Sequence, residues 1–157
     1  MPLFRTMLEN PRVAAVKNSS MPVQDIEQFK AAGGEGFVVF NGPDEQFVAG
    51  RAMGADGGIG GTYAMMPELF LKADALLCAG EVEKARSVQY DINEIIYAMC
   101  ACRGNLYAVM KEILRRRDGL ALGGVRAPLT NLAPADEAQV EKARALIAAA
   151  MQRAAAL

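Results

Sequence analysis

The chain has 157 residues and a nearly balanced charge, with 17 Lys and Arg against 18 Asp and Glu, and it contains no histidine. Balanced charge gives no general electrostatic reason to expect nucleic acid or an anionic membrane as a partner. The absence of histidine excludes Ser-His-Asp and Cys-His catalysis and almost every catalytic zinc site. The length excludes a complete eight-stranded α/β barrel, which needs roughly 250 residues.

Cysteine usage and apolar runs indicate the compartment. Cys78, Cys100 and Cys102 form no regular framework, so we expect small buried thiols in a reducing cytoplasm rather than disulfides. The longest apolar run, residues 95–102, has eight residues, far too few to cross a membrane. Charged residues interrupt the first stretch of the chain, which therefore offers no signal-peptide core.

The first part of the sequence alternates between helix-like and strand-like segments. Helical spacing covers residues 2–9, and the apolar run at 13–16 is typical of a strand buried on both faces. A helix is predicted from Pro22 to the stop at Gly33-Gly34. The next predicted elements are a strand at 37–40, a helix at 44–53, a glycine-rich strand at 57–60 and a helix at 67–79.

The second part of the sequence is helical only. Residues 81–102, 105–118 and 135–155 are predicted as helices with no strand between them. Alternating strands and helices indicate parallel strands joined by right-handed crossovers, with helices covering the sheet. We therefore predict an α/β fold in which residues 1–80 hold three βα units and residues 81–157 form a helical extension packed on them.

Chemistry is expected at the carboxyl ends of the strands, where parallel α/β proteins bind ligands. Lys17 follows the first strand. Desolvation at such a position disfavours the ammonium form and favours the neutral amine that a Schiff-base nucleophile needs. Taken alone, Lys17 is more simply explained as a lysine that reaches water from a strand end.

The second and third strand ends are equally open to two interpretations. Asp44 and Glu45 are adjacent carboxylates that suit either a helix start or the hydroxyl groups of a polyol. Residues 54–61 contain five glycines, which let a ligand approach the backbone closely. This segment matches neither the dinucleotide fingerprint nor a P-loop. Tyr90, Tyr97 and Tyr107 follow helical spacing and suggest no function.

Taken together, the three strand ends resemble the superfamily of N-acetylneuraminate lyase and dihydrodipicolinate synthase. Residues 15–20, Ala-Val-Lys-Asn-Ser-Ser, resemble its Schiff-base lysine strand, and residues 40–45 and 54–63 look like the next two strand ends. The Gly-x-Asp-Glu and Gly-Gly-Ile-Gly elements look closer to the lyase branch. The resemblance covers nearly the whole chain and implies a partial (β/α)8 TIM barrel, corresponding to strands six to eight and the C-terminal helices.

The resemblance implies a class I aldolase that cleaves N-acetylneuraminate to pyruvate and N-acetylmannosamine. It makes Lys17 the catalytic nucleophile and implies no metal or organic cofactor. The other substrate-binding positions that it implies are Ser19, Ile59 and Gly60 near the lysine, and Gly42, Asp44, Glu45 and Gly61 at the sugar. The expected small-molecule partner is a 2-keto acid of the pyruvate or sialic acid type.

The sequence departs from the family pattern at several places. Gly61 and Ala64 stand where the lyase branch usually has serine and asparagine, so the resemblance does not decide which sugar is bound. The loop that holds the substrate carboxylate and the proton-shuttling tyrosine ahead of the lysine strand have no counterpart. We therefore expect the C-terminal piece of a longer enzyme, a chain complemented by a separate N-terminal barrel half, or a half-barrel that forms a homo-oligomer. The alternatives are a non-catalytic half-barrel interaction module, another pyruvate-dependent 2-keto-acid aldolase, or a dihydrodipicolinate synthase.

Overall fold

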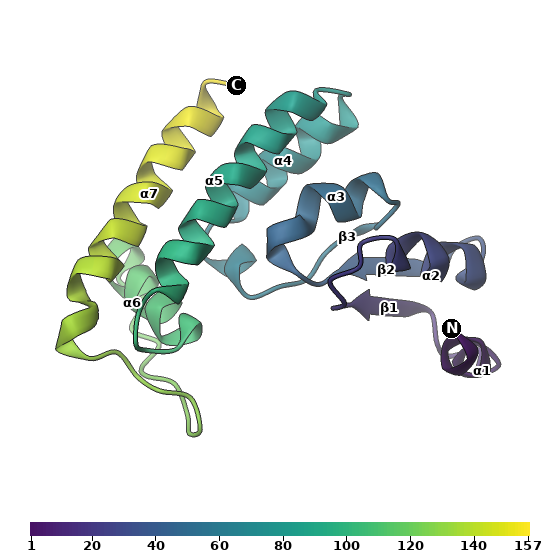
Figure 1. Ribbon diagram of the computed structural model, residues 1–157, viewed down its shortest axis with the longest axis horizontal. Coiled ribbons are helices and arrows are strands. Elements are labelled where there is room, and N and C mark those ends of the chain that lie inside the picture. Colours follow the sequence, from purple (N-terminus) through teal and green to yellow (C-terminus); the bar gives the residue numbers. More distant parts are fainter.

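Three short parallel strands form a sheet near one end of an elongated molecule (Figure 1). A computed structural model describes residues 1–157. The strands are β1 (Ala15–Asn18), β2 (Val38–Asn41) and β3 (Gly57–Gly58), and they lie side by side in chain order. Lys17 of β1 is opposite Phe40 of β2, which in turn is opposite Gly57 of β3. The parallel pairing confirms the predicted βα units.

The helices α2 (Asp25–Gly33) and α3 (Phe47–Ala52) pack on this small sheet, and α1 (Pro2–Leu8) packs beside α2, where Phe4 contacts Phe29. They cover one of its faces, where Phe4, Ile26, Phe37, Val39 and Ala55 form a compact buried cluster. Proline in the first turn of α1 removes an amide that no helix residue could bond. Gly34, with φ of 76°, ends α2 in the left-handed region.

The opposite face of the sheet has no covering helix. The prediction of a first strand at 13–16 buried on both faces is wrong in two respects. The strand begins two residues later, and Ala15 and Lys17 are exposed. Side chains alternate between the faces of a strand, so Val16 packs beside the helices while Ala15 and Lys17 point to the open side. An apolar run alone cannot show whether both faces have a partner.

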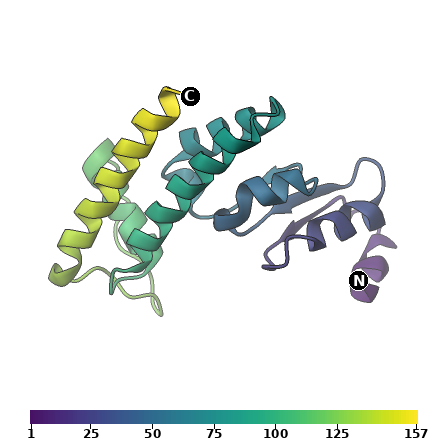
Figure 2. The ribbon, with the colours of Figure 1, turned by 45° about the horizontal axis from the view of Figure 1, so that its top comes forward.

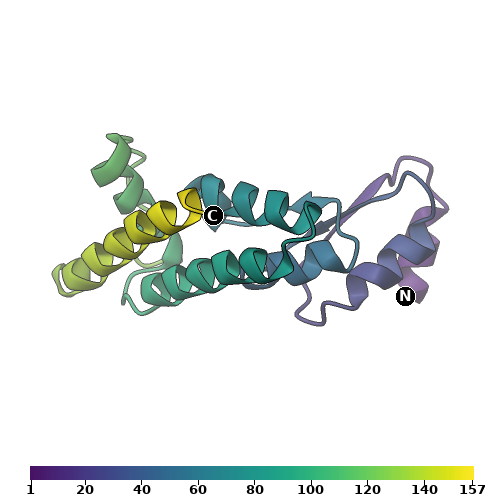
Figure 3. The same ribbon diagram turned by 90° about the horizontal axis from the view of Figure 1, so that it is seen from above.

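Four longer helices build the other end of the molecule, and they confirm the predicted helical segments. They are α4 (Pro67–Cys78), α5 (Val82–Cys100), α6 (Leu106–Asp118) and α7 (Glu137–Ala155). Helix α5 packs against both α4 and α7 (Figures 2 and 3). A core of 23 buried residues runs from Phe47 to Ala154 and therefore crosses residue 80. The division of the chain at residue 80 stays a prediction.

Charged groups join α6 to α7. Arg116 lies in the last turn of α6 and pairs with Glu112 one turn earlier, and with Glu137 and Glu141 of α7 at 2.6 and 2.5 Å. Hydrogen bonds from Arg115 and from Arg116 lower the pKa of Glu112 to about 2. The arginine run at 115–117 therefore ties two helices together in addition to complementing the helix dipole.

The cysteines differ from expectation. Cys78 and Cys100 are exposed and Cys102 is half-buried, and none is in a disulfide, so the prediction of small buried thiols is wrong. Cys78 and Cys100 are the last residues of α4 and α5, where the chain turns away from the helical core. None of the helices combines the length and the apolar character that crossing a membrane requires.

Candidate active site

The carboxyl ends of the three strands meet in one continuous region. The Gly42 amide, just after β2, donates to the Asn18 carbonyl at the end of β1 over 2.7 Å. The Ile59 amide, just after β3, donates to the Asn41 carbonyl over 2.9 Å. A Cβ atom on Gly42 would lie 2.6 Å from Ser19 Oγ, so Ser19 and Gly42 touch and only glycine fits.

Lys17 stands on the open face of the sheet at this edge. Its side chain is exposed and makes no hydrogen bond or ion pair within the chain. Phe40, its neighbour in β2, is half-buried on the same face. The partial desolvation that sequence reasoning allowed for Lys17 is therefore missing in this chain, because nothing in it covers the face that the lysine occupies.

Asp44 is buried and already bonded. Its Oδ2 atom accepts hydrogen bonds from the Thr62 amide at 2.9 Å and the Thr62 hydroxyl at 2.6 Å. Its Oδ1 atom is buried without a partner and lies against Gly60, where a Cβ atom would overlap it. One oxygen thus anchors the glycine-rich segment, and the other has no hydrogen-bond donor within the protein.

Two residues that sequence reasoning did not assign support this arrangement. The Tyr63 ring stacks on Phe70 with 3.9 Å between centroids, and its hydroxyl is buried beside Gly58 without a partner. Burial raises the pKa of Tyr63, and the nearby Asp44 carboxylate raises it further. Gln89 of α5 donates to the Asp44 carbonyl at 3.2 Å and accepts from the Val48 amide at 2.8 Å. A glutamine within a helical pattern gives no sequence signal for such a role.

The remaining candidates border the same region. Glu45 is half-buried and forms no hydrogen bond, while Ile59 is 47% exposed. Gly61 is half-buried, and its neighbour is Tyr107 of α6. The structure thus joins Ser19 to Gly42 and Asp44 to Gly60, but it brings no partner to Lys17.

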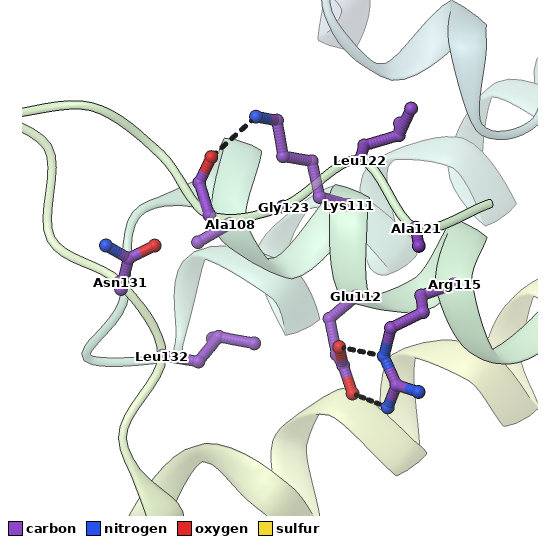
Figure 4. A pocket seen from close by; sticks show the side chains of 10 residues that line it. Ala108, Lys111, Glu112, Arg115, Ala121, Leu122, Gly123, Asn131 and Leu132 are labelled. Atoms are coloured by element: carbon purple, nitrogen blue, oxygen red, sulfur yellow. Dashed lines mark hydrogen bonds and ion pairs between the residues drawn. The ribbon is translucent and has the colours of Figure 1, made fainter.

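An open pocket elsewhere is unrelated to the strand ends. A cavity of about 430 Å³ opens between α6 and the loop that follows it (Figure 4). The Lys111 ammonium donates to the Gly124 carbonyl over 2.7 Å, and Glu112 pairs with Arg115, so its charged groups are bonded within the protein. No three Cys, Asp or Glu side chains lie close enough together to hold a metal ion.

Comparison with known proteins identifies the family. The model of the dihydrodipicolinate synthetase family matches residues 2–149. The chain belongs to this family. Within it, the chain belongs to the N-acetylneuraminate lyase branch, and it is 54% identical over 151 residues to the N-acetylneuraminate lyase of Mediterraneibacter gnavus. That alignment covers 96% of this chain and 48% of the lyase.

Solved structures of family members show the same fold. The wild-type sialic acid aldolase of Ruminococcus gnavus has a TM-score of 0.94 and 53% identity, covering 97% of this chain and 50% of the aldolase. A catalytic lysine mutant of that aldolase has a TM-score of 0.95 and 52% identity, covering 98% of this chain and 50% of the mutant aldolase. The N-acetylneuraminate lyase of Fusobacterium nucleatum complexed with pyruvate has a TM-score of 0.80 and 25% identity, covering 93% of this chain and 47% of that lyase. This member of the dihydrodipicolinate synthetase family thus spans about half the length of the relatives it matches.

Proposed function

We propose that this chain supplies the nucleophile and the sugar-binding side of a class I aldolase of the N-acetylneuraminate lyase type. The observation that supports this most is the position of Lys17. The lysine is the penultimate residue of β1 and lies on the uncovered face, at the same edge as the Ser19–Gly42 contact and the unpaired Asp44 oxygen. A nucleophile, a tight backbone approach and an acceptor for hydroxyl groups are what a retro-aldol site requires.

Lys17 starts the reaction by attack on the C2 ketone of the substrate. Loss of water gives a protonated imine, which withdraws electrons from the adjacent bond. The C3–C4 bond breaks as the C4 hydroxyl gives its proton to the proton-shuttling tyrosine of the missing amino-terminal half, so the leaving part departs as an aldehyde and the imine becomes an enamine. Protonation at C3 and hydrolysis of the imine release pyruvate and restore the Lys17 amine.

The sugar end of the substrate lies toward the second and third strand ends. Asp44 Oδ1 and the Glu45 carboxylate accept hydrogen bonds from hydroxyl groups of the substrate, because neither of them accepts a hydrogen bond from within the chain. Gly42 and Gly60 allow the substrate to approach the backbone, and Ser19 and Ile59 line the side near the lysine. This assignment makes the substrate an open-chain sugar acid such as N-acetylneuraminate.

The open face requires a partner. We assign it to an amino-terminal barrel half, which covers Lys17, excludes water and brings the carboxylate-binding loop and the tyrosine that this chain lacks. Removing water around Lys17 favours its neutral, nucleophilic form. The free thiols suit a cytoplasmic site, where such thiols stay reduced. Family enzymes of this kind tend to form oligomers, and we expect the assembled barrel to do the same.

Reduction by borohydride in the presence of pyruvate tests the proposal. This chain is mixed with, or fused to, the amino-terminal half of the 54% identical Mediterraneibacter lyase. Peptide mass mapping is expected to place a reduced pyruvate adduct on Lys17. Lys17→Arg should abolish the adduct, whereas Lys30→Arg should not, because Lys30 of α2 is paired with Asp56, which precedes β3 at the amino ends of the strands. An adduct elsewhere, or none, contradicts the proposal.

A non-catalytic half-barrel module is the second candidate, and the uncovered face of β1 favours it. This candidate predicts self-association through the open face with no Lys17 adduct, even when the amino-terminal half is supplied. Other 2-keto-acid aldolases, including dihydrodipicolinate synthase, share the lysine chemistry. They would be indicated if replacement of both Asp44 and Glu45 left turnover unchanged while the Lys17 adduct persisted.

A further inference from the structure

Gly61 is small because of a residue far away in the sequence. Its φ of −68° is one that any residue adopts, so backbone conformation does not demand glycine here. A Cβ atom at this position would lie 2.8 Å from Tyr107 Cε1 and 3.2 Å from the Tyr107 hydroxyl oxygen. Tyr107 of α6 therefore occupies the space that a side chain at Gly61 would take.

The position of Tyr107 is fixed by the start of α6. Asn105 caps the helix, since its side-chain oxygen accepts a hydrogen bond from the Tyr107 amide at 3.0 Å. The Asn105 amide in turn donates to the Thr130 carbonyl over 2.8 Å. Tyr107 thus extends from an anchored helix end, although its ring is 49% exposed. Its hydroxyl forms no hydrogen bond within the protein.

Tyr107 also borders the candidate site. Gly61 directly follows Gly60, which lies against the free Oδ1 atom of Asp44. Adjacent Cα atoms are about 3.8 Å apart, so the tyrosine and the carboxylate flank the same short segment. Asp44 and Glu45 give this edge negative charge, which disfavours phosphate or carboxylate groups and favours neutral hydroxyl groups as the ligand here.

We propose that Tyr107 is a specificity-determining residue that binds the hydroxyl-bearing carbon chain of the substrate. This inference rests on the proposed aldolase function and extends it to the helical part of the molecule. The phenol can both donate to and accept from a hydroxyl group, and the exposed ring gives the carbon chain an apolar surface. Asp44 and Glu45 then bind hydroxyls from one side, and Tyr107 binds them from the other.

The test compares two aldehydes in the condensation direction, in the protein completed with the Mediterraneibacter amino-terminal half. One aldehyde is N-acetylmannosamine, and the other is glyceraldehyde, whose shorter carbon chain carries fewer hydroxyl groups. Tyr107→Phe is expected to lower kcat/KM for N-acetylmannosamine about three- to tenfold, mainly through KM, which is the range for one lost neutral hydrogen bond. Glyceraldehyde turnover should stay unchanged.

Matched variants separate the possible outcomes. Tyr97→Phe removes another exposed phenol, from α5, where Tyr97 is 62% exposed, and should change the turnover of neither substrate. Gly61→Ala adds a Cβ atom without a hydroxyl group, so it should displace Tyr107 and lower sugar turnover as Tyr107→Phe does. Equal effects of Tyr107→Phe on both aldehydes, or none on either, would overturn the inference. The Lys17 adduct with pyruvate separates failure of the Tyr107 inference from failure of the aldolase proposal. If the unsubstituted protein forms no adduct, both proposals are overturned; if it forms the adduct, only the Tyr107 inference is at stake.

Discussion

Asp44 shows how one carboxylate can serve structure and ligand at once. Its two oxygens lie in different surroundings, because Oδ2 is bonded twice to Thr62 while Oδ1 is buried beside Gly60 with no partner. A buried acceptor without a partner costs free energy, and such groups are rare in folded proteins. A substrate hydroxyl would remove that cost, which is why we assign this oxygen to the ligand.

Replacement of Asp44 should therefore affect stability as well as binding. Asp44→Ala leaves the buried Thr62 amide and hydroxyl unpaired, and we expect it to lower the free energy of unfolding by about 1–3 kcal/mol in urea titrations. Asp44→Asn keeps an acceptor for Thr62, so it should lower the free energy of unfolding by less. Glu45→Ala serves as the control, because Glu45 bonds no protein group. Equal losses for Asp44→Ala and Glu45→Ala would refute the anchoring role.

At the scale of elements, Asp136 fixes how the last helices meet. Its carboxylate accepts from the Arg103 and Gly104 amides in the turn after α5, at 2.6 and 3.2 Å. It also accepts from the Ala133 amide at 2.9 Å, just before α7. These amides, with that of Ala133 the strongest cause, hold the pKa of Asp136 below its ordinary value. One side chain thus joins the start of α7 to the α5–α6 turn.

These hydrogen bonds predict that Asp136→Asn lowers the stability of the protein in a pH-dependent way. A carboxylate whose pKa is lowered by folding stabilises the protein above its unfolded pKa, and that stabilisation is lost as the pH falls through the folded pKa. We expect thermal scans to show a Tm about 4 °C or more below that of the unsubstituted chain above about pH 5, with the difference shrinking below about pH 4. Asp118→Asn, at an exposed pair with Arg117, should change Tm little at either pH. A pH-independent difference would contradict the carboxylate's role.

At the scale of the whole molecule, the two ends differ in how completely they are packed. The helical end contains the large core, whereas the sheet has helices on one face only and two unpaired outer strands. Unpaired strand edges and an uncovered face favour association with another polypeptide. The fold therefore leaves the face of the sheet that carries Lys17 without a covering layer.

Hydrogen exchange can test this difference directly. In the chain alone, amides of β1 and β3 are expected to exchange much faster than those in the middle of α5, since they have fewer buried contacts. Addition of the amino-terminal half should slow exchange at residues 14–18 and 57–60, and leave α5 as an internal control. Unchanged exchange at both strands, with Lys17 still modified by amine reagents, would contradict a partner on the open face.

Much of the element order could be predicted from the sequence. Apolar runs, helical spacing and glycine or proline stops predicted three parallel βα units followed by helices, because these signals depend on residues close together in the chain. The same local patterns predicted that Lys17, Asp44 and Gly60 lie at the carboxyl ends of strands, and in the structure all three lie there. Their roles as catalytic and binding residues stay predictions.

Only the tertiary structure decided which surfaces meet. It showed that one face of β1 is uncovered, that Asp44 bonds Thr62, and that Tyr107 occupies the space beside Gly61. It also showed that Cys78 and Cys100 are exposed. Each of these facts depends on packing between segments far apart in the chain. Local sequence patterns report a residue's own element and not what lies against it, so they could predict the strand ends but not their surroundings.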